Sequence, residues 1–167
     1  MREPVIDPDR ELILSTLTES YAGPAWHGPS VLEALEGIDA AAAFRKPTQQ
    51  RNSIWELVLH LAHGRHLLTA RTLDRDVDSF PRAIRQPWWP VSPQRADAAA
   101  WKADLALLEK TQERLLQAIR DATPEQLARV PAAGDQSIAR QLLGMSLHDT
   151  YHAGQIRLLA LILAQTS

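Results

Sequence analysis

Two histidines, His148 and His152, stand four residues apart near the C-terminal end of the chain. Residues four apart on an α-helix project from one face, so both imidazoles can reach the same metal ion. The chain has no cysteine, which leaves nitrogen and oxygen as the available metal donors. The spacing alone also suits surface histidines or hydrogen-bonded core histidines. It therefore indicates a candidate metal site without naming a reaction.

The residue that follows the first histidine of this pair argues against a protease. It is Asp149, in the string His148-Asp149-Thr150-Tyr151-His152. A zinc protease with the motif H-E-x-x-H needs a glutamate there as its general base. The sequence therefore disfavours a zinc protease.

A third ligand can be sought among His60, His63 and His66 in the middle of the chain. The apolar residues of this segment recur at helical spacing: Ile54, Leu57, Val58, Leu61 and Leu68. At about 100° per residue, the three leucines and Ile54 centre roughly 90° from His60 and roughly 150° or more from His63 and His66. His60 is thus the best inward candidate. We expect His63 and His66 to be solvated or at a polar rim, and His27 to lie in a loop.

The segments that must position these histidines have the pattern of helices. Ser53 and Glu56 match a capping box at the start of one of them. The expected helices run over about 8–21, 30–35, 53 to 73 or 75, 97–121, a short segment from Thr123, and 137–164. Four of them are long, and no segment alternates in polarity, so a sheet is not expected. The sequence predicts an all-α fold in which four long helices form a bundle.

Between the second and third long helices, residues 77–93 form a connection that contains four prolines. Proline does not fit the interior of a regular helix, so we expect an irregular segment. The pair Trp88-Trp89 is apolar for an exposed loop and should pack over the bundle or the mouth of a pocket. The pair could cover either the cavity or a dimer interface.

Length and composition exclude several classes of protein. A chain of 167 residues suits one domain, 1–167. The net charge is -2 and no block of Lys and Arg occurs, so no nucleic-acid partner is expected. Residues 1–8 contain acids and prolines where a secretion signal needs a basic start and an apolar stretch. The longest apolar run, 158–164, is too short to cross a membrane. We expect a cytoplasmic protein that does not bind membranes.

The strings Ser53-Ile54-Trp55-Glu56-Leu57-Val58-Leu59-His60 and His148-Asp149-Thr150-Tyr151-His152-Ala153-Gly154-Gln155-Ile156 resemble the DinB/YfiT-like family of metalloenzymes. That family has one histidine on the second helix and an HxxxH pair on the last. The resemblance implies a four-helix bundle with up-down-down-up topology and a long crossover between helices 2 and 3. It also implies that His60, His148 and His152 bind one divalent metal ion, for which zinc or nickel is favoured.

Three imidazoles leave a divalent ion at least one open position, which suggests chemistry. A metal held in this way lowers the pKa of bound water or of a thiol, or polarises a carbonyl group. Relatives implied by the resemblance include S-transferases that use bacillithiol or mycothiol, and mycothiol-dependent maleylpyruvate isomerase. Since this chain has no cysteine, a thiolate nucleophile must come from a small molecule. We expect a metal-dependent transferase with a small-molecule substrate and a thiol cosubstrate of low molecular weight.

Several residues near the ligands are candidates for supporting roles. Tyr151 and Gln155 flank the ligands, and Arg157 or Arg71 could meet an anionic substrate. A glutamine or aspartate often orients a ligating imidazole, so Gln155 and Asp149 are candidates, and helical angles place Gln155 nearer the ligand face.

Other functions remain open at this stage. The alternatives are a noncatalytic metal-binding or stress-associated interaction or dimerisation module, and a metal-dependent hydrolase. A homodimer is also expected, because exposed apolar surface on a bundle can form a symmetric contact and relatives dimerise.

Overall fold

A computed structural model of the chain describes residues 8–74, 77–132 and 134–165. Residues 1–7, on which the secretion argument rests, and Arg75, one of the two predicted helix ends, lie outside the described residues. The long helices are α1 (Pro8–Ala22), α4 (Ile54–Leu73), α5 (Ala98–Asp121) and α7 (Ile138–Gln165); the short ones are α2 (Val31–Leu35), α3 (Ala40–Phe44) and α6 (Pro124–Ala128). The predicted all-α class is confirmed.

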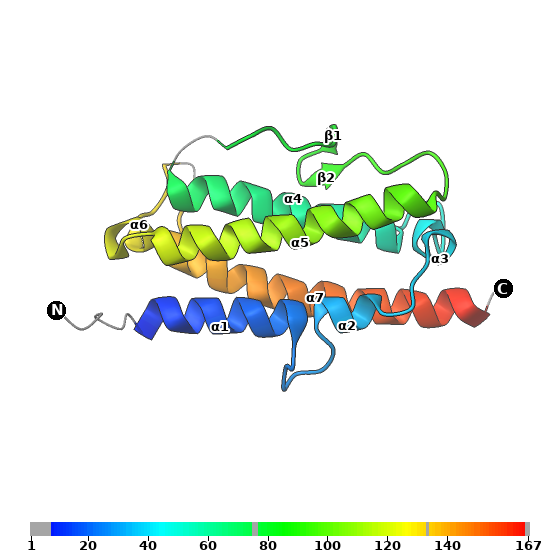
Figure 1. Ribbon diagram of the computed structural model, residues 1–167, viewed down its shortest axis with the longest axis horizontal. Helices are drawn as coiled ribbons and strands as arrows, with labels where there is room; N and C mark the ends of the chain where they lie inside the picture. The colour runs from blue at the N-terminus through cyan, green and yellow to red at the C-terminus, as the bar shows by residue number, and fades with distance from the viewer. Residues whose placement is uncertain (1–7, 75–76, 133, 166–167) are drawn as a thin grey trace.

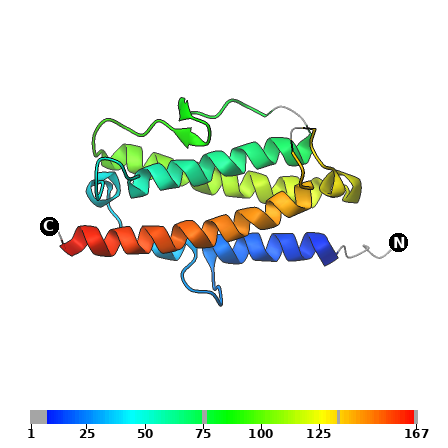
Figure 2. The ribbon, with the colours of Figure 1, turned by 180° about the vertical axis from the view of Figure 1, so that it is seen from behind.

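The long helices lie lengthwise beside one another. α1 and α7 run in one direction, and α4 and α5 run in the opposite direction (Figures 1 and 2). α4 packs against α5 and α7, while α7 also packs against α1 and α2. The segment between α4 and α5 therefore has to return along the length of the molecule, and it does so over α4 (Figure 1).

The helix starts follow from local side-chain chemistry. The Glu56 backbone N–H donates to the Ser53 hydroxyl at 3.2 Å, and the Ser53 N–H donates to the Glu56 carboxylate at 2.8 Å. This is the predicted capping box, and it satisfies two amides that a helix start otherwise leaves unpaired. Asp97 accepts from the Ala100 N–H at 2.8 Å and so caps α5. Thr123 begins α6 in the same way as Ser53 begins α4.

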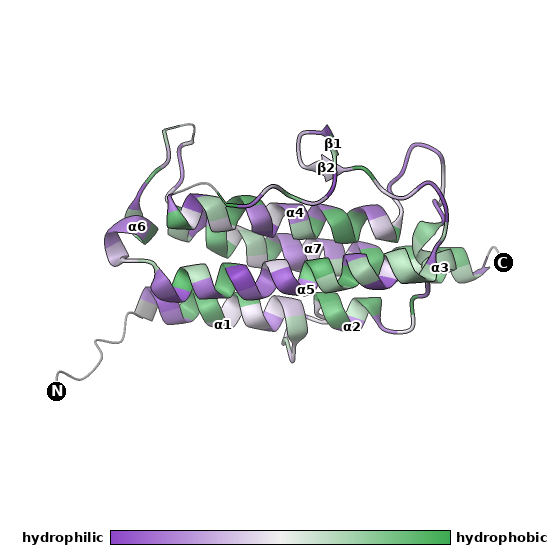
Figure 3. Cartoon of the chain, turned by 45° about the horizontal axis from the view of Figure 1, so that its top comes forward, coloured by the Kyte–Doolittle hydropathy of each residue, from purple (hydrophilic) through white to green (hydrophobic). Residues whose placement is uncertain are grey.

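The crossover contains a small antiparallel hairpin, formed by β1 (Ile84–Gln86) and β2 (Trp89–Pro90). The expectation that the chain has no sheet is wrong here. The pairing is irregular, with a register shift between Ile84 and Gln86, and β2 packs on α4 (Figure 3). Packing on the helix below holds these two short strands, which the polarity pattern does not reveal.

The apolar core has two parts, separated by a polar layer. One part surrounds Trp55 and Trp101, and the other surrounds Leu115 and Ile138. Between them lies Arg65, which is fully buried and donates to both carboxylate oxygens of Asp149 at 2.8 and 2.7 Å. A buried ion pair of this kind fixes how the helices that carry it are placed, provided that its remaining polar atoms are satisfied.

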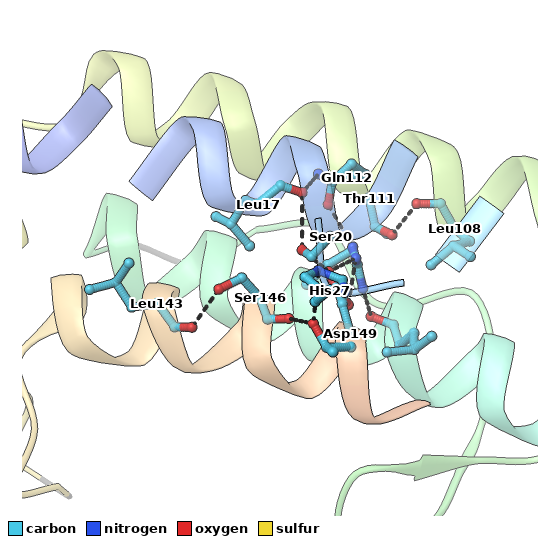
Figure 4. A network of polar contacts seen from close by, with 12 residues as sticks. Leu17, Ser20, His27, Leu108, Thr111, Gln112, Leu143, Ser146 and Asp149 are labelled. Carbon is cyan, nitrogen blue, oxygen red and sulfur yellow. Dashed lines mark hydrogen bonds and ion pairs between the residues drawn. The ribbon is translucent and has the colours of Figure 1, made fainter. Parts of the chain in front are cut away.

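The remaining polar atoms of this layer are satisfied by the other two long helices. Arg65 Nε donates to Gln112 of α5 at 2.7 Å, and the hydroxyl of Ser20 of α1 donates to Asp149 at 3.1 Å. Gln112 in turn donates to the Leu17 carbonyl at 3.2 Å. Figure 4 shows Ser20, Gln112 and Asp149 coming together between their helices. All four long helices therefore share one hydrogen-bonded layer.

None of the helices in the described part of the chain combines the length and the apolar character needed to cross a membrane. Hydrophilic and hydrophobic residues are mixed along the long helices (Figure 3).

Candidate metal centre

The structure brings together the three histidines that the sequence analysis selected. His60 projects from α4, and His148 and His152 project from α7. The Nε2 atom of His148 lies 3.0 Å from that of His60 and 2.9 Å from that of His152. His60 and His152 are buried and His148 is half-buried, and these residues could hold a metal ion.

The hydrogen bonds behind the rings decide which nitrogen faces the centre. His60 Nδ1 lies 2.8 Å from the Trp88 carbonyl oxygen, which only accepts, so the proton is on Nδ1 and Nε2 carries a lone pair. His152 Nδ1 lies 2.7 Å from Gln155 Oε1 and is protonated for the same reason. The amide nitrogen of Gln155 donates to the Tyr151 hydroxyl at 2.9 Å, which keeps its oxygen turned towards His152.

These tautomers make the centre suitable for a cation. His60 and His152 both direct unprotonated Nε2 atoms at His148 Nε2, and a neutral His148 has one proton that it can donate to one of them, whereas a cation can accept the lone pairs of all three. His148 Nδ1 is buried and has no hydrogen-bond partner within the described ranges. The cost of taking this nitrogen out of water is therefore not offset by a hydrogen bond. Three neutral imidazoles are a donor set that divalent transition metals accept. The residues present therefore fit a divalent metal.

The turn at Trp88-Trp89 forms part of this centre. The Trp89 ring stacks on His60, with centroids 4.2 Å apart and planes inclined by 12°. Trp88 has φ 74°, in the left-handed region that a non-glycine residue adopts at some cost, and its carbonyl oxygen accepts from His60. The expectation that this pair packs over the bundle is confirmed, and the crossover orients one of the three histidines.

Burial keeps the three imidazoles neutral. Desolvation, with a smaller contribution from the neighbouring imidazoles, lowers the pKa of His148 to about 3 and that of His152 to about 4, although the hydrogen bond to Gln155 opposes the change at His152. Desolvation also lowers the pKa of His60, although the hydrogen bond to Trp88 opposes the change. A neutral imidazole is the form that binds a metal, so the site does not need to lose protons at neutral pH.

We expect the metal-free protein to lose stability as the pH falls from about 6.5 towards 4. An unfolded histidine has a pKa near 6.5, so below that pH the unfolded state binds more protons than the folded state, and the free energy of unfolding decreases. Urea unfolding at several pH values, with a chelator present, measures the slope. Burial raises the pKa of Asp149, and this changes the free energy of unfolding with pH in the opposite direction. His148→Gln keeps Asp149 and is therefore the reference against which the contribution of His148 is measured. An equal slope in this variant would show that His148 titrates normally.

The other candidate residues have mixed outcomes. Gln155 lies where it was expected, on an imidazole. Tyr151 is 62% exposed, accepts a hydrogen bond from Gln155, and places its ring edge-on to the ring of His152 with centroids 5.1 Å apart. Arg157 is exposed and lines a separate cavity, of about 350 Å³, with Gly28 and Glu33. Arg71 is exposed and donates to Gln141 at 2.9 Å.

Two expectations about nearby residues are not met. His63 is buried, with 6% exposed, and its ring packs on Phe80 of the crossover at 5.0 Å. The expectation that it is solvated or at a polar rim is therefore wrong, because the angle on one helix does not reveal a covering segment from elsewhere. Asp149 does not orient an imidazole, because both of its carboxylate oxygens are bonded to Arg65. His66 is half-buried and His27 is exposed, as expected.

The residue that the sequence analysis missed is Arg65. It stands between Leu61 and Leu68 on the apolar face of α4, and Asp149 stands in the same way between Met145 and Ile156 on α7. A cation and an anion that each interrupt the apolar face of a helix indicate a buried ion pair. This signal was present in the sequence.

A cavity of about 770 Å³ lies away from the three histidines. It is lined by residues of α4, of α5 and of the first part of the crossover, among them His66, Asp78 and Arg114. Arg114 and Asp78 form an ion pair across it at 3.7 Å.

Comparison with known proteins identifies the family. The sequence model described as the DinB superfamily matches residues 26–156, a range that contains all three histidines. No curated protein and no solved structure matches the chain. Since the match covers most of the sequence, the chain belongs to the DinB superfamily.

Proposed function

We propose that the protein binds one divalent metal ion through His60, His148 and His152 and is a metal-dependent enzyme that acts on a small molecule. The observation that carries this proposal is the convergence of three imidazoles: His148 Nε2 lies within hydrogen-bond distance of the Nε2 atoms of His60 and His152, and the ligand atoms of all three lie within 4.8 Å of one another. We further propose that the chain is one domain with the family's four-helix bundle, in the up-down-down-up topology. The directions of the four long helices and the crossover between α4 and α5 support that assignment.

The roles of the individual residues follow from their contacts. Trp88 and Gln155 accept the Nδ1 protons of His60 and His152, which keeps both rings in the tautomer that can ligate. The stacked ring of Trp89 shields His60 from water. A divalent metal bound here supplies a Lewis acid that lowers the pKa of a bound thiol or water.

A thiol transfer is the reaction that we favour. The chain contains no cysteine, so it has no thiol nucleophile of its own to compete with or replace a small-molecule thiol. In such a transfer the thiol sulfur forms a bond to an electrophilic carbon, the leaving group departs with the bonding electrons, and the thiol proton passes to solvent. The cosubstrate would be a thiol of the bacillithiol or mycothiol class, with zinc or nickel at the centre.

A noncatalytic metal-binding module is the second candidate. It is favoured by the closed surroundings of the centre, where His60 lies under Trp89, and by the position of the 770 Å³ cavity, which the three histidines do not line.

We expect the zinc-loaded or nickel-loaded protein to consume bacillithiol or mycothiol in the presence of 1-chloro-2,4-dinitrobenzene, with release of chloride. His148→Ala should abolish this turnover, and His63→Ala should retain it, because His63 is buried on the same helix as His60 but outside the centre. Thiol loss followed by a colorimetric reagent measures the rate. Bound metal without turnover for either thiol would favour the noncatalytic module. Metal-dependent hydrolysis of a nitrophenyl ester without thiol would favour a hydrolase.

A further inference from the structure

The crossover between α4 and α5 is attached to the bundle at a buried carboxylate, that of Asp104 on α5, which is 1% exposed. Its Oδ1 atom accepts two hydrogen bonds from Arg82 of the crossover, from Nε at 3.1 Å and from Nη2 at 2.6 Å. Its Oδ2 atom accepts from the indole Nε1 of Trp55 on α4 at 2.8 Å. One carboxylate therefore joins α4, α5 and the crossover. We call the contact between Arg82 and Asp104 the Arg82 anchor.

Two other ion pairs of the crossover are weaker than this anchor. Arg85 lies 3.6 Å from Glu56 with 47% of its side chain exposed, and Asp78 lies 3.7 Å from Arg114 with both side chains exposed. Both distances are too long for a hydrogen bond, and exposed ion pairs contribute little to stability. Hydrogen bonds between charged groups are about twice as strong as neutral ones, and the Arg82 anchor has two of them on a buried oxygen.

A short hairpin connects the anchor to the candidate metal centre. Arg82 stands two residues before β1, and Trp88 follows it by six residues, in the turn that leads into β2. The Val91 N–H donates to the Ala83 carbonyl at 2.7 Å, and β1 pairs with β2, so both ends of the turn are joined beside the anchor. The carbonyl oxygen of Trp88 then accepts from His60 Nδ1.

The conformation of the turn requires a firm attachment. Trp88 has φ 74°, and a non-glycine residue stays in this costly region only where the surrounding structure fixes it. A hairpin of three and two residues is too short to fix it alone, since isolated two-stranded hairpins are marginally stable at best in water. The packing of β2 on α4 supports one strand, and the Arg82 anchor supports the approach to the other.

We propose that Arg82 is a positioning residue of the candidate metal centre, which through its ion pair with Asp104 keeps the Trp88 carbonyl on His60. This role rests on the proposed function, because it matters for a metal only if His60 is a ligand. Arg82 acts on one imidazole of the three, since Gln155 orients His152 from α7 itself. The structure therefore assigns a residue of the crossover, bonded to none of the three histidines, to the orientation of one of them.

The Nδ1 proton of His60 in the metal-free protein tests the positioning without any metal. Its hydrogen bond to Trp88 protects it from exchange with water, and the free energy of local opening sets the exchange rate. In Arg82→Gln, which keeps a polar side chain without the charge, this proton should exchange about tenfold faster or more. The Nδ1 proton of His152, which is bonded to Gln155, should exchange at an unchanged rate. Proton NMR of protein with ¹⁵N-labelled histidine measures both rates.

Zinc titration tests the consequence for the metal. Arg82→Gln should lower the zinc affinity by about tenfold, as loss of a residue that orients a ligand does. Arg82→Lys keeps the charge and should recover part of this loss. Arg85→Gln is the matched control, because it removes a charge from the same hairpin but from an exposed and longer ion pair, and it should leave the affinity within about threefold. Asp104→Asn attacks the anchor from α5 and should reproduce the effect of Arg82→Gln on His60, which keeps the test available if Arg82→Gln does not fold.

The outcomes separate this proposal from the proposed function. Faster exchange at His60 alone supports the positioning role, and it does so even if the natural protein binds no zinc, a result that would overturn only the metal function. Unchanged exchange at His60 in Arg82→Gln would overturn the positioning role. Equal acceleration at His60 and His152 would also overturn it, because Arg82 would then act on the stability of the whole fold. An equal loss of zinc affinity in Arg85→Gln would show that any charge on the hairpin has the same effect, which contradicts the anchor.

Discussion

Replacement of Asp149 by alanine should lower the free energy of unfolding by about 3–5 kcal/mol. Asp149 and Arg65 are both fully buried, and their atoms lie as close as 2.7 Å. Without the carboxylate, the guanidinium stays in the core with no counter-charge, and removal of one partner of a buried pair is much more costly than removal of both. Urea or guanidinium denaturation of the purified variant measures the effect.

The matched control replaces both partners. Arg65→Met/Asp149→Leu exchanges the ion pair for apolar side chains of similar volume, and we expect its stability to lie within about 1 kcal/mol of the natural protein or above it. Asp149→Asn keeps a hydrogen-bond acceptor for Arg65, so its free energy of unfolding should lie between that of Asp149→Ala and that of the double variant. If Asp149→Ala lowers the free energy of unfolding by less than about 1 kcal/mol, water reaches Arg65 and the polar layer is not fully buried.

Replacement of His148 by alanine should lower the affinity for zinc or nickel by more than about 100-fold. Loss of a residue that merely orients a ligand costs about 10–100-fold, and loss of a ligand costs more. Gln155→Ala removes the acceptor for His152 Nδ1 and should therefore give a smaller loss, in the 10–100-fold range. Isothermal titration calorimetry with zinc or nickel measures these affinities.

His63→Ala is the control for this series. His63 is buried and carried by the same helix as His60, but it is not one of the three residues that could hold the ion. Its removal should leave the affinity within about threefold of the natural protein. Equal losses for His63→Ala and His148→Ala would show that the effect comes from disturbed packing, and unchanged affinity in His148→Ala would exclude this centre as the metal site.

The sequence predicts the helices well because their starts depend on neighbouring residues. The side chains of Ser53 and Asp97 accept from amides three residues ahead, and α4 and α5 begin where these caps indicate. The choice of His60 over its neighbours also depends on one helix alone, since only its angle to the leucines is needed. The observed convergence of His60 with His148 and His152 agrees with that choice.

The features that the sequence analysis did not predict depend on contacts between distant segments. The hairpin at Ile84–Gln86 and Trp89–Pro90 is short and irregular, and it is held where β2 packs on α4. The burial of His63 depends on Phe80 of the same crossover. The short helix Ala40–Phe44 follows a cap at Asp39 that was visible in the sequence but was not used.

The three histidines come from two helices that are far apart in the chain, and this has a consequence for the unfolded protein. His60 and His148 are 88 residues apart. An ion held by both would close a loop of that length, and a cross-link over about 100 residues removes conformational entropy worth roughly 4–5 kcal/mol from the unfolded chain. That gain is available only while the ion stays bound during unfolding. The ion would then act as a reversible cross-link in a chain that has no disulfide. A chelator would remove this constraint on the unfolded chain as well as emptying the site, while the Arg65–Asp149 ion pair still joins α4 to α7 in the folded protein.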